Sequence, residues 1–282
     1  RYPELTDRVD MVAGGPPCQP FSLGGKHQAY QDKRDMFPEA VRAVRELRPE
    51  CFVFENVKGL LRQSFASYFQ YIILQLSYPM LVRKPDEDWQ SHLSRLERHH
   101  TGRKEGDLSY QVIYRLLNAA DYGVPQHRHR VFIVGFRSDL RKEWSFPSAT
   151  HSFDRLLWDL WVTGDYWEEH RVPKKQRPAI PEKLSARVGR LESEFGLLPP
   201  PGERCRTVRD ALRGLPDPRD KTDTVPNHEF RDGARPYPGH TGSELDAPSK
   251  ALKAGDHGVP DGENTMALPV SRKREQTLEM AA

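Results

Sequence analysis

The chain is poor in cysteine and has no long apolar run, and both shortages restrict its possible class. Its 282 residues include only three cysteines, Cys18, Cys51 and Cys205, which lie far apart and form no CxxC pair. This pattern argues against a disulfide framework and a structural zinc site, so we expect no metal. No run of about 18 apolar residues occurs, so we expect no transmembrane span and no membrane partner. A reducing cytoplasm is the setting that these features predict.

The chain also has little net charge. Lys and Arg number 43 against 40 Asp and Glu, which leaves a formal charge of +3. So small an excess gives weak support for a nucleic-acid partner. The basic residues nevertheless gather in short clusters, and a solvated face is the simplest interpretation of each. These clusters lie at residues 128–130, 171–177, 204–213 and 272–274.

The first half of the chain alternates strand patterns with helix patterns. Helical spacing of apolar residues occurs at 37–47, where Pro49 follows, and at 65–76. Residues 84–107 are polar and are expected to form a surface excursion. This alternation predicts an α/β fold with a mostly parallel sheet. The expected strands lie at residues 9–13, 51–54, 110–113 and 131–136.

The composition changes in the second half. Of the 24 prolines, 14 follow residue 172. Helical periodicity fades there except at residues 207–213. We therefore predict a boundary near residue 150, with one domain over 1–150 and a loop-rich region over 151–282.

Three polar motifs lie at the ends or starts of the predicted strands. Cys18 follows the first strand, Glu55-Asn56 follows the apolar run CFVF, and residues 126–130 lead into VFIVGF. In open α/β sheets, sites form in the crevice beyond the carboxyl ends of the strands. The sequence therefore predicts that these motifs converge on one site.

Each motif suits chemistry but also has a plainer interpretation. Prolines around Cys18 restrict the positions of a nucleophilic thiol, although the residue could simply fill a polyproline turn. Glu55 follows an apolar strand, and a partly desolvated carboxylate suits proton donation; the alternative is a helix N-cap. Arg128 and Arg130 share a face if the segment is extended, which suits a phosphate or carbonyl oxygen, but also an exposed strand edge.

Taken together, the three motifs resemble one family. GGPPCQPFS at 14–22, FENVKGL at 54–60 and ADYGVPQHRHRVFIVGFR at 120–137 are similar to motifs of the cytosine-C5 DNA methyltransferases of bacterial restriction-modification systems. The resemblance is close over residues 9–137. It implies a partial Rossmann-like, S-adenosyl-L-methionine-dependent methyltransferase sheet in residues 1–150. The smaller region 151–282 would be the target-recognition domain.

The resemblance implies a covalent mechanism on duplex DNA. The family extrudes a cytosine from the helix, because its reactive carbons are unreachable in the stack. Cys18 matches the nucleophile that adds to C6, and Glu55 the acid that engages N3. Arg130 matches the arginine that holds O2, and Arg128 its supporting neighbour. C5 then takes a methyl group from S-adenosyl-L-methionine, and release of the thiol restores the ring.

The resemblance also implies a wider set of contacts. Pro17 matches a residue beside the cofactor, and residues 22–35 match a mobile loop that closes over DNA. The loops at 239–242 and 245–258 look like recognition loops, although their members could equally be solvated loop residues. The expected substrate-binding residues are Gln19, Ser22, Lys26, Asn56, Gln126, His240, Thr241, Lys250 and Lys253.

The chain departs from the family at both ends. Members begin with a glycine-rich cofactor turn and end with a further strand and helix, and neither pattern occurs here. The chain is thus expected to be a fragment, a subunit of a split enzyme completed by a second polypeptide, or an inactive DNA-binding remnant. Methylation of tRNA cytosine is the nearest alternative activity. A bacterial DNA methyltransferase would be cytoplasmic and associated with the nucleoid.

Overall fold

The chain divides into two compact units. The computed structural model describes residues 3–17, 35–102, 108–196, 198–219, 225–226, 228, 242–252, 265–267 and 278–279. The first unit comprises Arg1–Leu117 and His129–Phe146, and the second Asn118–Arg128 and Pro147–Ala282. None of the described helices is both long and apolar enough to cross a membrane. Because each unit combines two separate stretches of the chain, the polypeptide passes between the units more than once.

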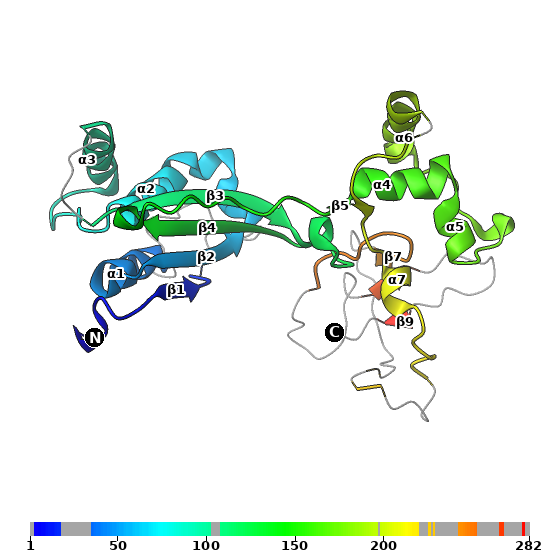
Figure 1. Ribbon diagram of the computed structural model, residues 1–282, viewed down its shortest axis with the longest axis horizontal. Helices are drawn as coiled ribbons and strands as arrows, with labels where there is room; N and C mark the ends of the chain where they lie inside the picture. Colours follow the sequence, from blue (N-terminus) through cyan, green and yellow to red (C-terminus); the bar gives the residue numbers. More distant parts are fainter. Residues whose placement is uncertain are drawn as a thin grey trace. The chain divides into compact units, whose positions relative to one another are not determined.

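A four-stranded mixed sheet forms the centre of the first unit (Figure 1). Its strands, in spatial order, are β1 (Met11–Gly14), β2 (Cys51–Val57), β4 (His129–Arg137) and β3 (Tyr110–Asn118). β1 runs parallel to β2, whereas β4 runs antiparallel to β2. The α/β fold class is confirmed, but the expectation of a mostly parallel sheet is wrong. Only residues 119–128 connect β3 to β4, too few for the crossover that a parallel pair needs.

Two helices follow the sequence pattern closely. α1 (Phe37–Leu47) buries Phe37, Val41 and Val44 and ends at Arg48, whose φ of 50° is left-handed. α2 (Ala66–Ser77) packs with α1 into the same apolar core, which includes Phe52 of β2. Both predicted helices are confirmed, and their apolar stripes supply the side chains that bury one face of the sheet.

A further helix occupies the segment that was expected to be a surface excursion. α3 (Trp89–Gly102) buries His92 and Leu96 and contacts α2. The segment is nevertheless at the surface, because His92 and Leu96 are its only buried residues among those described. His92 is buried between the Tyr71 hydroxyl, 2.8 Å from its Nδ1, and the Leu81 carbonyl oxygen, 2.7 Å from its Nε2. A buried, hydrogen-bonded histidine adds nothing to an apolar stripe.

Gly135 lies opposite Phe52 in the β2–β4 pair, under the aromatic ring. A Cβ at this position would fall within 3.0 Å of that ring. Phe52 is fully buried and stacks against Phe54 and Tyr110, at 5.2 and 5.3 Å between centroids, so the ring cannot retreat. We expect Gly135→Ala to lower the free energy of unfolding by about 2 kcal/mol, because overpacking a tight core costs about 1–3 kcal/mol. Urea unfolding measures this change.

Gly189→Ala is the matched control for that substitution. Gly189 lies inside helix α6 (Glu182–Phe195), and a Cβ there meets no atom within 4 Å. Alanine should stabilise this helix by about 0.5–1 kcal/mol, because glycine is a poor helix former. Equal effects of the two alanines would contradict the steric explanation.

The second unit is more helical than the sequence pattern indicates. Its helices are α4 (Phe153–Leu157), the π-helical turn η8 (Trp158–Val162), α5 (Asp165–Glu169), α6 and α7 (Val208–Leu212). Helix α7 agrees with the prediction at 207–213, and the other described helices of this unit were not expected from the sequence. Seven of residues 153–162 are apolar, and Leu156, Leu157, Trp158 and Leu160 are buried.

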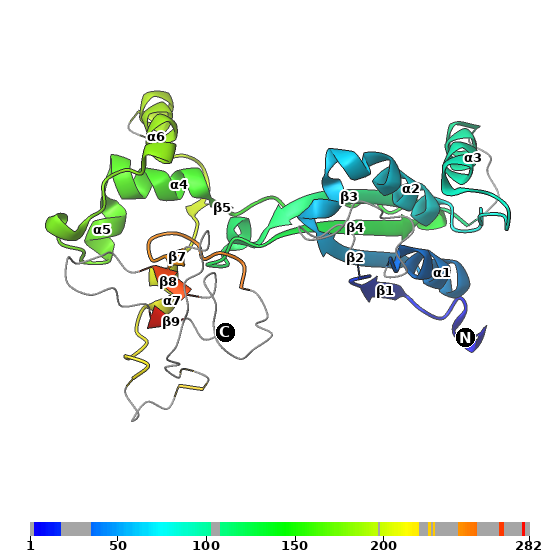
Figure 2. The same ribbon diagram turned by 180° about the vertical axis from the view of Figure 1, so that it is seen from behind.

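Short elements complete the described parts of both units (Figure 2). The short strands are β5 (His151–Ser152), β6 (Glu203–Arg204), β7 (Ser243–Glu244), β8 (Thr265–Ala267) and β9 (Leu278–Glu279). The 3-10 turns are η1 (Pro3–Leu5), η4 (Lys58–Leu61), η5 (Gln63–Phe65), η6 (Ala119–Tyr122), η7 (Ser138–Leu140) and η9 (Lys174–Gln176).

Candidate active site

Glu55 and Arg130 meet on one face of the sheet. In the β2–β4 pair, Val57 lies opposite Arg130 and Glu55 opposite Phe132, so Glu55 and Arg130 are diagonal neighbours. Arg130 Nε lies 2.5 Å from Glu55 Oε1, and the guanidinium also donates to the His129 carbonyl oxygen at 2.9 Å. The exposed fraction of the side chain is 36% for Glu55 and 23% for Arg130. The pair is thus preformed and still reachable from solvent.

Strand β2 extends further than predicted. It runs to Val57, so Glu55 and Asn56 lie within the strand and do not cap a helix. The expected strand end after Phe54 was wrong because the sheet register, rather than side-chain polarity, decides where pairing stops. Pairing with β4 continues to Val57, opposite Arg130. The consequence is that a strand, and not a loop, positions the carboxylate.

The segment that leads to Cys18 is held beside this strand. The buried Asn56 donates from Nδ2 to the Pro16 carbonyl oxygen at 3.0 Å, and its Oδ1 accepts the Val57 amide at 2.9 Å. At Gly15 an added Cβ would lie 3.5 Å from Glu55 Oε2. The backbone before Cys18 therefore passes directly beside the carboxylate, and Pro17 is exposed there.

Several predicted site residues lie outside the described residues. They are Cys18, Gln19, Ser22, Lys26, His240, Thr241 and Lys253. Their roles stay predictions.

The other two thiols are poor nucleophiles. Burial raises the pKa of Cys205 to about 12, and its Sγ lies 3.4 Å from the Ala120 carbonyl oxygen. Burial, followed by the charges of Glu50 and Asp10, also raises the pKa of Cys51. A thiol must ionise to attack, so neither suits covalent catalysis near neutral pH.

The second unit holds the remainder of the third motif. The backbone amide of the exposed Arg128 donates to Asn118 Oδ1 at 3.1 Å, and its carbonyl oxygen accepts the Ala119 amide at 3.1 Å. Gln126 bridges to Ser249, and the Ser249 amide donates to the Pro125 carbonyl oxygen at 2.9 Å. Lys250 directly follows Ser249 in the chain, so the structure places it beside the Gln126 segment in space.

Asn118 is a positioning residue that the sequence analysis missed. Its buried side chain also donates from Nδ2 to Asp121 Oδ1 at 3.1 Å and lies 3.3 Å from His127 Nδ1. One amide therefore shapes the turn that carries Gln126 and Arg128. An asparagine directly after the apolar pair Leu116-Leu117 was the signal available, since such residues bond to nearby backbone.

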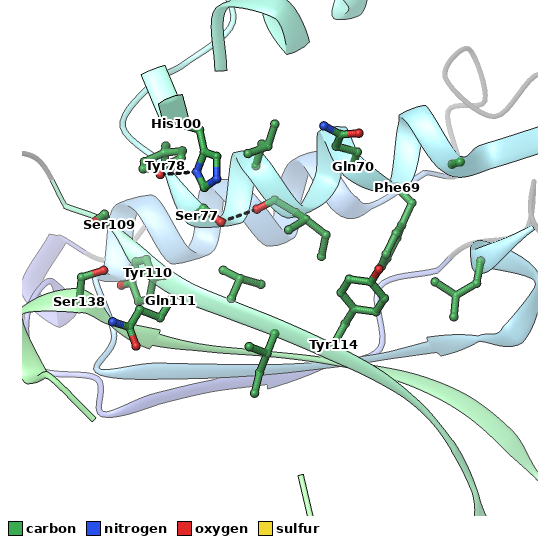
Figure 3. A pocket seen from close by; sticks show the side chains of 16 residues that line it. Phe69, Gln70, Ser77, Tyr78, His100, Ser109, Tyr110, Gln111, Tyr114 and Ser138 are labelled. Atoms are coloured by element: carbon green, nitrogen blue, oxygen red, sulfur yellow. Dashed lines mark hydrogen bonds between the residues drawn. The ribbon is translucent and has the colours of Figure 1, made fainter. Parts of the chain in front are cut away.

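A cavity in the first unit is separate from these motifs. It has a volume of about 880 Å³ and lies between α2 and β3 (Figure 3). Phe69 and Tyr114 face each other at one end, and the Tyr78 hydroxyl lies 2.7 Å from His100 Nδ1 at the other. No residue predicted for the site lines it.

A cluster in the second unit has the donor types of a metal site. Ligand atoms of Glu169, His170 and Asp210 lie within 4.8 Å of one another. Arg204 already donates to Glu169 at 2.7 Å and to Asp210 at 3.3 Å. Burial opposes ionisation of Asp210, but hydrogen bonds from Thr207 and the charge of Arg204 outweigh it and lower the pKa of that carboxyl. A guanidinium therefore balances these carboxylates, which favours an ion-pair network over a metal centre.

Comparisons with known proteins agree on one family. The family model described as C-5 cytosine-specific DNA methylase matches residues 2–78 and 91–228. Type II methyltransferase M.AquIA of Picosynechococcus sp. is 42% identical over 144 residues, which are 51% of this chain and 49% of that protein. Type II methyltransferase M.AplI of Arthrospira platensis is 34% identical over 215 residues, covering 76% and 48% of the two chains.

The chain spans about half or less of the length of these curated relatives. Among solved structures, the crystal structure of S. pombe Dnmt2 methyltransferase is 14% identical, with a TM-score of 0.37 over 95% of this chain and 58% of that one. That score is too low to add to the argument.

Proposed function

Because the chain belongs to the C-5 cytosine-specific DNA methylase family, we propose that it is the catalytic part of a DNA cytosine-5 methyltransferase. The Glu55–Arg130 pair carries this proposal. N3 and O2 are neighbouring atoms on one edge of cytosine, and an acid beside a guanidinium matches that edge. Type II methyltransferases among the relatives support duplex DNA as the substrate.

The proposed reaction is nucleophilic catalysis by Cys18. The thiolate forms a bond to C6 while Glu55 gives a proton to N3, so the electron pair of the C5–C6 double bond is available at C5. Arg130 holds O2 and keeps the ring in place. After methylation, a base removes the C5 proton and the S–C6 bond breaks. The C5–C6 double bond and the thiolate are restored, and N3 returns its proton to Glu55.

S-adenosyl-L-methionine is the proposed cofactor and would supply an electrophilic methyl group to C5. The end of β1 fits such a group, because Gly14 and Gly15 carry no side chain and Pro17 is exposed. Glycine next to Glu55 leaves room beside the carboxylate.

Further contacts to the cofactor would come from additional polypeptide. Met11 keeps 54% of its exposure on β1, and among the described strands β1 pairs only with β2. A strand of a methyltransferase sheet is ordinarily covered on both faces. We propose that more chain, of the same protein or of a second one, covers it. Gln126, Arg128 and Lys250 are proposed as DNA contacts of a nucleoid-associated enzyme.

Transfer of a labelled methyl group tests this function. The complete protein, supplied with labelled cofactor, should methylate duplex DNA at least about 100-fold faster than tRNA, because recognition contacts specify the substrate. A duplex with 5-fluorocytosine at the target should trap a covalent adduct on Cys18, since fluorine at C5 cannot leave as a proton does. Preferential methylation of tRNA would reject DNA as the substrate, and binding without any adduct would reject catalysis.

A further inference from the structure

The residues that flank segment 18–34 on either side meet near the end of β1. The Met36 amide donates to the Pro17 carbonyl oxygen at 3.4 Å, which joins the residues on either side of the segment. The Asn56 side chain donates from Nδ2 to the carbonyl oxygen of Pro16, on the first of these two sides. The residues on either side of the segment that contains Cys18 are therefore fixed in the first unit.

Asp35 ties the second of these two sides to two helices. Its Oδ1 accepts the Phe37 amide at 3.0 Å, which is an Asx turn at the start of α1. Its Oδ2 accepts a short hydrogen bond from the hydroxyl of Tyr68 on α2. A carboxylate near a helix N-terminus is also favoured by the helix dipole. Asp35 thus holds the chain where segment 18–34 ends.

The hydroxyl of Tyr68 is itself rigidly placed. The Tyr68 ring is buried and packs edge-on against Trp89, 5.6 Å away, and near Tyr71, 5.9 Å away. These neighbours leave the ring little rotational freedom, so its hydroxyl is a fixed point. Asp35 is consequently anchored to the core and not only to its own turn.

We propose that Asp35 and Tyr68 are positioning residues for the nucleophile, a role that rests on the proposed function of Cys18. They fix one end of the Cys18 segment relative to Glu55 on β2. Effective attack requires the sulfur and C6 to approach within a narrow range of distances, and errors of about 1 Å can cost about 100-fold in rate. A hydroxyl on α2 therefore acts on the reaction through Asp35, without touching the base.

Tyr68→Phe removes only the hydroxyl and is the primary test. In the complete, cofactor-supplied protein, we expect it to slow adduct formation with the 5-fluorocytosine duplex about 10-fold at saturating DNA, with duplex affinity unchanged, because positioning affects the chemical step. Tyr71→Phe is the matched control. Tyr71 is equally buried one turn along α2, and its hydroxyl contacts His92 at 2.8 Å instead. It should lose similar stability and keep the adduct rate.

Two substitutions of Asp35 separate positioning from general loss of structure. Asparagine can still accept the Phe37 amide and hydrogen-bond to the Tyr68 hydroxyl, so Asp35→Asn should retain most of the rate. Asp35→Ala should resemble Tyr68→Phe or be slower. If Asp35 only stabilised the fold, the two variants would form the adduct at the same rate once their rates are corrected for the folded fraction. Thermal unfolding measures that fraction.

A second readout does not depend on activity. Peptide mass spectrometry can follow iodoacetamide labelling of the three cysteines in residues 1–282. Tyr68→Phe should raise the labelling rate of Cys18 about threefold through local opening, whereas Cys51 labels unchanged. If the wild-type protein forms the adduct, and Tyr68→Phe forms it at the same rate with unchanged labelling of Cys18, the positioning role is overturned while the proposed function stands. A wild-type protein that labels normally but forms no adduct would overturn the proposed function, and the catalytic role of the anchor with it.

Discussion

Replacing Cys18 with serine should abolish methyl transfer, lowering its single-turnover rate by about 10⁴-fold or more. A serine hydroxyl is not ionised near neutral pH and is a far weaker nucleophile than a thiolate. The covalent route is then closed, and cytosine C5 is too weak a nucleophile without the bond at C6. The fluorinated duplex should show no adduct. Duplex affinity should change little, because phosphate contacts dominate it.

Cys51→Ser is the matched control for that substitution. Cys51 begins β2 and is half-buried, and its pKa is raised by burial. We expect full adduct formation and transfer from this variant. Loss of activity in Cys51→Ser, or an adduct in Cys18→Ser, would reject the assignment of the nucleophile.

Replacing Glu55 with glutamine should give the second-largest loss, about 10³-fold in the single-turnover rate. Glutamine keeps the shape and can still donate a hydrogen bond to N3, but it cannot deliver a proton. The variant should therefore bind the extruded cytosine and fail to activate it. Quenched-flow measurement of the adduct shows this directly.

Glu50→Gln is the corresponding control. Glu50 is exposed and directly precedes β2, so it is close in the chain but has no part in the pair. It should leave the rate within about twofold of wild type, as expected for surface substitutions. If Glu55→Gln kept the wild-type rate, proton donation would have to come from another group.

Much of the first unit could be predicted from the sequence. Apolar spacing located α1 and α2, and apolar runs located the four strands of the sheet. The encounter of Glu55 with Arg130 also follows from two polar motifs beside apolar runs. The register of the strands that carry these motifs could not be predicted, because strand order and direction depend on contacts between distant segments.

The polar interior was beyond sequence reasoning. Asp35, Tyr68 and Asn118 act through specific hydrogen bonds, and polar residues of these types are most often solvated. Helix α6 was missed for a different reason. Its apolar residues Leu184, Val188 and Leu191 do follow a helical period, but charged neighbours and nearby prolines concealed it.

Residues 118–128 connect two stretches of the first unit but belong to the second, and this has a consequence for recombination between relatives. These residues lie between two strands of the first unit, yet they pack within the second. Ala120 is fully buried beside Leu156 and Cys205, and Asp121 accepts the Thr150 amide at 3.0 Å. A chimaera that exchanges only the chain after residue 150 would join this loop to a foreign core. Exchange of the second unit by homologous crossover therefore has to transfer two separate pieces together, or accept a mismatched interior.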